Sequence, residues 1–368
     1  MMGARVRDLI RLGVFGLIAV AVLAASADAQ RTASVALSAD PGRVCLEPRA
    51  GGQMNFDLVM HNRTDRAITV SQLEASVINT RGEMIEHRIV WQDAVTGLGP
   101  HRTLSAGQTG ILFNPFTFRT ASADTRIRYD VQFEGAAPAS ITIEPQSCAT
   151  NARLTLPLTG RILVYDGYDY LSHHRRQTYQ LEPQLRAFGV IDNWYRFGID
   201  LIHTDAEGRL HRSDGSRIED WYAWGQPVRA PGAGVVHAIR NDEPDNDIGT
   251  ENRRTSRPLS EDEMNSDGNY VLIDHGEGEF SLLSHLKQGS VRVRPGERVR
   301  AGQLVGEVGN SGATPVPHLH YELRTSPGFG VRGVRTLPPY FHDLQIIGLG
   351  RMPRSGLPVN TGDVLISR

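Results

Sequence analysis

The chain has 368 residues, of which 40% are hydrophobic and 22% charged, and its formal net charge at pH 7 is −2. A chain of this length is expected to fold into about two domains. Its composition is typical of a folded protein and excludes a disordered chain. The near-neutral charge also argues against nucleic-acid binding, because that function relies on a basic surface that neutralises phosphates.

Residues 1–29 have the pattern of a secretory signal peptide. Arg5, Arg7 and Arg11 precede an apolar run over residues 12–25, and the small-residue motif Ala-Asp-Ala follows at 27–29. An uncleaved anchor is the competing interpretation, but the apolar run is short for a membrane helix. We therefore expect a periplasmic or secreted protein with no stable membrane span after cleavage.

The chain contains only two cysteines, Cys45 and Cys148, and both follow the predicted cleavage site. In an oxidising compartment two such cysteines favour a disulfide, which stabilises the folded chain by closing a long loop. A zinc site on these cysteines is disfavoured, because no cluster of further ligands lies near them in the sequence.

Residues 30–148 are predicted to form an Ig-like β-sandwich. Short runs rich in β-formers alternate with turn residues, at the spacing typical of antiparallel β domains. The predicted strands cover residues 55–60, 68–77, 85–91, 110–113, 127–133 and 140–143. Residues 149–160 follow as a predicted linker.

Residues 161–368 are predicted to be a second domain, also rich in β-strands. Glycine turns separate apolar runs over 225–236, 268–275 and 293–306, which predicts hairpins. Apolar residues at helical spacing over 181–188 predict one short helix. The chain is thus expected to be all-β, with two domains.

Histidines at His-x-His spacing near the C-terminus are the strongest functional signal. His318 and His320 lie in an apolar, strand-like run, and period two places both side chains on one face of a strand. His285 lies in another apolar run, and Asp200 follows the sequence Gly-Ile. One imidazole of the pair could hold a metal while the other faces a substrate.

Taken in order, these motifs resemble the M23 family of zinc metallopeptidases, the LytM or lysostaphin-like endopeptidases. The resemblance covers roughly residues 161–345 and implies an antiparallel β-sheet peptidase domain. It implies a Zn²⁺ ion bound by Asp200, His320 and one upstream histidine, with His285 and His318 as catalytic residues beside the metal. Such a site keeps one position for water, whose pKa the metal lowers.

The sequence departs from the family pattern at the first ligand. The common form is His-x-x-x-Asp, but Arg196 stands four residues before Asp200, and a guanidinium offers no lone pair to a metal. The sequence Ser172-His173-His174 resembles a variant branch in which the histidine lies further upstream. Because His173 directly follows the serine, it is the preferred metal ligand, with His174 as the alternative.

The resemblance implies peptidoglycan as the partner and hydrolysis of its peptide bonds as the reaction. The competing hypothesis is a metal-free scaffold that binds or activates a cell-wall hydrolase, which would make a regulatory protein a second partner. A metallopeptidase that acts on protein substrates is the third interpretation.

Overall fold

The computed structural model forms two compact units, Met1–Val44 with Phe56–Pro145, and Cys45–Asn55 with Gln146–Arg368. The structure describes residues 34–46, 53–148, 150–187, 190, 193–250, 266–328, 334–342, 344–348, 350–351 and 359–367. The predicted signal peptide lies outside these residues. Among the described residues, no helix has both the length and the apolar character needed to cross a membrane.

The first unit contains two antiparallel sheets. Three strands form the order β1-β3-β7: β1 (Val35–Asp40), β3 (Asp57–Asn62) and β7 (Thr109–Phe113). The larger sheet has the order β5-β4-β8-β9, with β6 (Thr103–Leu104) paired to β4: β5 (Met84–Trp91), β4 (Ile68–Ile78), β8 (Arg126–Glu134) and β9 (Ala139–Ile143). Each of the six strands expected from the sequence here overlaps an observed strand. The Ig-like assignment stays a prediction.

Alternation of buried and exposed residues explains why these segments form strands. In β8, Ile127, Tyr129 and Val131 are buried, whereas Arg126 and Arg128 are exposed. One face of the strand therefore packs into a core and the other contacts solvent. The one helical segment described in this unit is the 3₁₀ helix η1 (Gln92–Leu98).

A disulfide joins Cys45 and Cys148, as predicted, and closes a loop of 103 residues. Next to these cysteines, β2 (Cys45–Leu46) and β10 (Gln146–Ser147) pair in parallel. The segment predicted to be a linker packs in part as core, because Leu154, Leu156 and Leu158 are buried in the second unit. Apolar residues at alternate positions suit a strand, and this segment forms β11 (Leu154–Thr155), which pairs with β22 (Phe341–His342).

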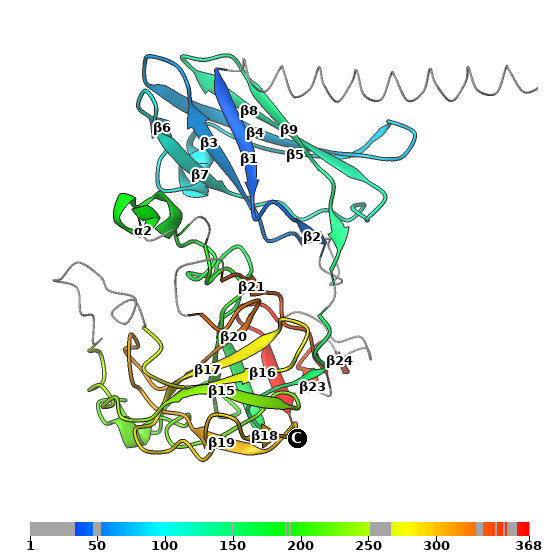
Figure 1. Ribbon diagram of the computed structural model, residues 1–368. Helices are drawn as coiled ribbons and strands as arrows, with labels where there is room; N and C mark the ends of the chain where they lie inside the picture. Colours follow the sequence, from blue (N-terminus) through cyan, green and yellow to red (C-terminus); the bar gives the residue numbers. More distant parts are fainter. Residues whose placement is uncertain are drawn as a thin grey trace, which may run out of the picture. The chain divides into compact units, whose positions relative to one another are not determined.

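A single antiparallel sheet organises the second unit (Figure 1). Its order is β18-β15-β16-β17-β20-β13-β12-β25-β23-β24, with β21 (Thr336–Leu337) paired to β20. The strands are β18 (Arg298–Val299), β15 (Gly234–Arg240), β16 (Asn269–Asp274), β17 (Phe280–Leu286), β20 (Leu319–Arg324), β13 (Ile199–His203), β12 (Gly160–Asp166), β25 (Val364–Ser367), β23 (Leu344–Ile346) and β24 (Gly350–Arg351).

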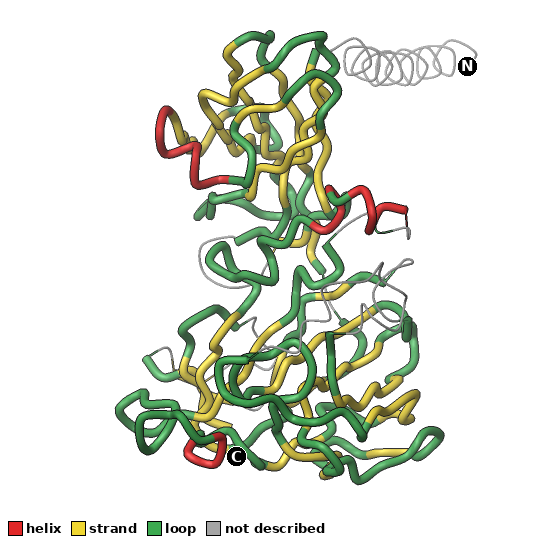
Figure 2. The backbone as a smooth tube through the Cα atoms, turned by 90° about the vertical axis from the view of Figure 1, so that its left-hand side faces the viewer, coloured by secondary structure: helices red, strands yellow, loops and turns green. Residues whose placement is uncertain are grey.

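Helix is confined to short segments in the described part of both units, as Figure 2 shows, so the all-β prediction is confirmed. In the second unit these are η2 (Tyr179–Leu181), η3 (Ile218–Asp220) and α2 (Pro183–Ala187), the last within the range expected to be helical. A small ribbon of β14 (Pro227–Arg229) and β19 (Leu304–Glu307) accompanies the main sheet.

Strands β17 and β20 lie near the middle of this sheet, and every residue in both is buried. Strands buried throughout are covered on both faces; β17 is mostly apolar, whereas β20 alternates apolar residues with His320, Glu322 and Arg324. Polar residues within such strands are therefore unusual, and their position depends on the register of the sheet.

Candidate metal centre

Strand register brings four polar side chains into one row across the sheet. Asp166 in β12 lies opposite Asp200 in β13, Asp200 lies opposite His320 in β20, and His320 lies opposite Ser284 in β17. Directly opposite residues of antiparallel strands project to the same face. The row therefore places two carboxylates and an imidazole side by side, although they are far apart in the sequence.

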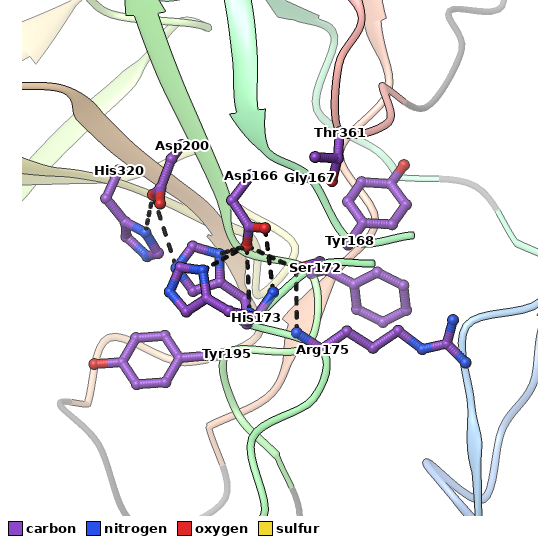
Figure 3. Close-up of polar contacts among 12 residues, drawn as sticks. Asp166, Gly167, Tyr168, Ser172, His173, Arg175, Tyr195, Asp200, His320 and Thr361 are labelled. Carbon is purple, nitrogen blue, oxygen red and sulfur yellow. Dashed lines mark hydrogen bonds and ion pairs between the residues drawn. The ribbon is translucent and has the colours of Figure 1, made fainter. Parts of the chain in front are cut away.

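Three imidazoles converge on one oxygen of Asp200. His320 Nδ1 lies 2.9 Å from Asp200 Oδ1, His318 Nε2 lies 3.3 Å from it, and His174 Nε2 lies 3.7 Å from it. All four residues are buried, each less than a tenth exposed. Figure 3 shows His320 and Asp200 in this arrangement.

His285 reaches the site by a local distortion of β17. Ser284 lies opposite His320, so regular alternation would point the next side chain, His285, to the other face of the sheet. Between the pairs Asn269–Leu286 and Val271–Leu283, β17 carries one residue more than β16, which is a β-bulge.

The backbone of His285 also has a φ of 60°, which is unusual for a residue other than glycine. With this backbone its ring centroid lies 4.9 Å from that of His318 and 5.8 Å from that of His320. The bulge therefore adds a fourth imidazole to the site.

Backbone carbonyls determine which nitrogen carries the proton in two of these rings. His285 Nδ1 lies 2.8 Å from the carbonyl oxygen of Ser311, and His318 Nδ1 lies 2.9 Å from that of Val316. A carbonyl oxygen only accepts hydrogen bonds, so Nδ1 is the donor in both rings. In the neutral state Nε2 of each ring then keeps its lone pair for the site.

His174 comes from the loop that follows β12, and Asp166 organises this loop. Asp166 accepts hydrogen bonds from the backbone N–H groups of His173 and His174 and from the hydroxyl of Ser172 (Figure 3). His174 Nδ1 lies 2.9 Å from Asp166 Oδ2, and its Nε2 points to Asp200.

His173 lies at the edge of the same group. Its Nδ1 is 3.0 Å from Asp166 Oδ2, but its side chain is 61% exposed, against 8% for that of His174. Asp166, His173, His174 and Asp200 together offer ligand atoms within 4.8 Å of one another, a grouping that could hold a metal ion.

The protonation states of His174, His285 and Asp200 suit metal binding, whereas hydrogen bonds to Asp200 and Glu322 raise the pKa of His320 to about 10. Burial lowers the pKa of His174, and burial together with the charges of His318 and His320 holds the pKa of His285 well below its usual value. Burial acts to raise the pKa of Asp200, but the neighbouring His174 and His318 hold it well below its ordinary range. Neutral imidazoles and an ionised carboxylate are the forms that bind metals.

Sequence reasoning missed the charged residues behind His320. His320 Nε2 lies 2.9 Å from Glu322 Oε1, and Arg324 donates to the other oxygen of Glu322. Arg324 Nη2 also lies 3.6 Å from Asp267 Oδ2, and all four residues are buried. The period-two spacing of His318 and His320 extends to Glu322 and Arg324, so this signal was present in the sequence.

Arg196 makes a contact outside the centre. Its side chain donates to Asn55 Oδ1 at 3.3 Å, and Asn55 belongs to the N-terminal segment of the second unit. The histidine that faces Asp200 from the preceding loop is therefore His174, while the guanidinium bonds elsewhere.

A buried carboxylate surrounded by imidazoles on one face of a sheet is typical of a metallohydrolase. Comparison with known proteins identifies the class more closely: residues 218–331 match peptidase family M23, so the chain contains a domain of this family. The matched range includes His285, His318 and His320, whereas His174 and Asp200 precede it.

Two relatives support the same family. A stretch of 99 residues, 27% of this chain and 17% of the relative, is 45% identical to peptidoglycan DD-endopeptidase ShyA of Vibrio cholerae. A stretch of 68 residues, 18% of this chain and 16% of the relative, is 37% identical to murein hydrolase activator EnvC of Escherichia coli. The chain thus spans less than a fifth of the length of either relative.

Among solved structures, a mutant catalytic domain of the prophage-encoded M23 protein EnpA from Enterococcus faecalis is similar. It shares 24% identity, and the match covers 38% of this chain and 72% of the EnpA chain, with a TM-score of 0.23.

Proposed function

We propose that this protein is an exported zinc metalloendopeptidase that hydrolyses peptide bonds of peptidoglycan. The observation that supports this most directly is the convergence of His174, His318 and His320 on one oxygen of Asp200. Burial of four such polar groups is costly, and a cation bound among them would offset that cost.

His174, Asp200 and His320 would hold the zinc ion. Two imidazole nitrogens and a carboxylate oxygen form a donor set that suits zinc and leaves a position open. When bound, the ion activates water and polarises the peptide carbonyl as a Lewis acid. His174 takes the role for which the sequence pattern favoured His173, because its Nε2 faces Asp200 and its side chain is buried.

His285 and His318 would transfer protons. Each ring donates from Nδ1 to a backbone carbonyl, which fixes its orientation and leaves Nε2 facing the site. The lowered pKa of His285 keeps that nitrogen unprotonated at neutral pH, so it can accept a proton from attacking water. A ring protonated in this way can return the proton to the leaving amine.

Peptidoglycan as substrate rests on two supports. The chain contains an M23 domain, and ShyA, a protein named as a peptidoglycan DD-endopeptidase, is 45% identical over the part that aligns. The predicted signal peptide would take the protein to the periplasm or outside the cell, where this polymer lies. A regulatory protein that acts on the enzyme is compatible with this location.

Zinc content and digestion of peptidoglycan test the proposal together. We expect purified protein to hold about one zinc ion per chain, as a three-ligand catalytic site requires. His320→Ala should lose the ion, and the exposed His101→Ala should keep it as a matched control. Purified peptidoglycan should release peptide fragments with the wild type, and chromatography of the soluble products would detect them.

The results separate the proposal from its alternatives. If the chain binds no zinc under any loading condition, the proposal of a zinc enzyme is overturned and the hypothesis of a metal-free scaffold remains. If the zinc-bound chain cleaves unrelated protein substrates but leaves peptidoglycan intact, the metallopeptidase activity is supported and peptidoglycan is rejected as the substrate.

A further inference from the structure

The segment that carries His174 lacks the strand pairing that supports Asp200, His285 and His320. Asp200, His285 and His320 lie in paired strands, whereas the described residues between Asp166 and Ile199 contain no strand. The position of His174 therefore depends on side-chain hydrogen bonds to this connection. Besides Asp166, two buried asparagines, Asn193 and Asn55, make such bonds.

Asn193 links the backbone of His174 to the segment that leads to Asp200. Its Nδ2 donates to the carbonyl oxygens of His174 at 2.7 Å and Arg175 at 2.9 Å, and its Oδ1 accepts from the backbone N–H of Tyr195 at 3.1 Å. Carbonyls only accept and the N–H only donates, so the orientation of this amide is determined. The residue is 4% exposed.

Asn55 makes a second link between the same two segments. Its Nδ2 donates to the carbonyl oxygen of Tyr168 at 2.7 Å and to that of Arg196 at 3.2 Å, while its Oδ1 accepts from the Arg196 guanidinium. Tyr168 follows Asp166 closely in the loop shown in Figure 3, and Arg196 precedes Asp200. Asn55 is 2% exposed and lies far from both in the sequence.

We propose that Asn193 and Asn55 are positioning residues that hold the segments 166–175 and 193–200 together, so that His174 Nε2 faces Asp200. This inference rests on the proposed function, because it gives His174 the role of a zinc ligand. From its place in the second segment Asn193 donates to two carbonyls of the first, and Asn55 donates to one carbonyl of each segment. The loss of either amide leaves buried carbonyls without these donors and frees the loop to move His174 away.

Substitution by aspartate tests this role, because aspartate has the shape of asparagine but lacks the donating NH₂ group. In the full chain we expect Asn193→Asp and Asn55→Asp each to weaken zinc binding about 10- to 100-fold, the loss typical of groups that orient a ligand. Competition with a chromophoric chelator measures the dissociation constant.

Asn62→Asp is the matched control. Asn62 is fully buried in the first unit, donates from Nδ2 to the carbonyls of Arg66, Leu104 and Ser105, and accepts from the backbone of Thr64. Its substitution should lower the thermal unfolding midpoint without changing the zinc dissociation constant. Equal loss of zinc affinity in this control would mean that general destabilisation is the cause, and would overturn the inference.

Hydrogen–deuterium exchange of the metal-free chain separates this inference from the proposed function. Amides of residues 166–175 should exchange about tenfold faster in Asn193→Asp than in the wild type, because a buried hydrogen bond is lost locally. Unchanged exchange together with unchanged zinc affinity in both site variants would overturn the positioning role. A wild type that takes up no zinc would overturn the proposed function instead, and the exchange rates would still decide whether the asparagines hold the loop.

Discussion

His174 Nε2 lies 3.7 Å from Asp200 Oδ1, the same oxygen that His320 Nδ1 approaches to 2.9 Å. The two histidines reach this oxygen by different means. Strand register places His320 directly opposite Asp200, and neighbouring side chains hold the loop that carries His174. The centre thus combines a rigid half from the sheet with a half whose geometry depends on individual hydrogen bonds.

Substitution of the two adjacent histidines distinguishes the ligand. We expect His174→Ala to lose most of its zinc, because it removes a buried nitrogen that faces Asp200. His173→Ala should retain zinc, because its side chain is 61% exposed and its Nδ1 contacts Asp166. Metal analysis of both purified variants checks this. Loss of zinc in His173→Ala alone would restore the assignment made from the sequence.

A methyl group at Gly198 should disturb the centre directly. A Cβ atom there would lie 2.9 Å from His320 Cε1, 3.1 Å from the Tyr195 carbonyl oxygen and 3.5 Å from His174 Cγ. Gly198→Ala should therefore shift the His320 ring, lower the free energy of unfolding by about 1–3 kcal/mol and weaken zinc binding.

Gly42→Ala is the control for this substitution, because a Cβ atom at Gly42 meets nothing within 4 Å. Chemical denaturation and zinc titration of both variants give the two measurements. Zinc affinity equal to that of the wild type in Gly198→Ala would show that the ring and the loop adjust without cost to the site.

The sequence predicted the parts of this site that follow from periodicity. Alternation predicted a shared face for His318 and His320 and would have included Glu322; His318 lies one residue before β20 and still faces Asp200. Alternation cannot predict His285, since a bulge and a positive φ turn its side chain to the site. It also cannot choose between His173 and His174, which lie in a loop where no period applies and only local hydrogen bonds decide.

Glu322 should determine which nitrogen of His320 faces the metal. It accepts from Nε2, which leaves Nδ1 for the ion. Glu322→Gln replaces the anionic partner by an amide, so we expect zinc affinity to fall about 10- to 100-fold. The free energy of unfolding should also fall by about 3–5 kcal/mol, because Arg324 loses its closest buried partner.

Arg324→Gln separates these two effects, because Arg324 bonds the oxygen of Glu322 that does not face His320. This variant should lose a similar amount of stability while its zinc dissociation constant stays closer to that of the wild type. Zinc titration and denaturation of the two proteins in parallel measure the difference. If both lose zinc affinity equally, the ion pair supports the fold and has no specific effect on His320.

Proton release on zinc uptake should report on His320. Burial acts to lower the pKa of this ring, but its hydrogen bonds to Asp200 and Glu322 raise it to about 10 in the metal-free chain. Burial instead lowers the pKa of His174 and His285, so these rings are already neutral at about pH 8. Zinc must therefore displace the proton of His320 Nδ1 when it binds at this pH, and ionisation of the metal-bound water adds to the number of protons released. Calorimetry in two buffers with different heats of ionisation measures this number, and binding without proton release would contradict the assignment.

The same raised pKa sets the pH dependence of the metal-free protein. The folded chain holds the His320 proton more tightly than the unfolded chain, whose imidazole has a pKa of about 6.5. The stabilisation is therefore fully present below about pH 6.5 and is lost as the pH rises toward about 10, since the folded state binds more protons over this range. The thermal unfolding midpoint of the metal-free wild type should fall between about pH 7 and pH 10. The decline should be weaker in His320→Gln, and an equal decline in both proteins would assign it to other groups.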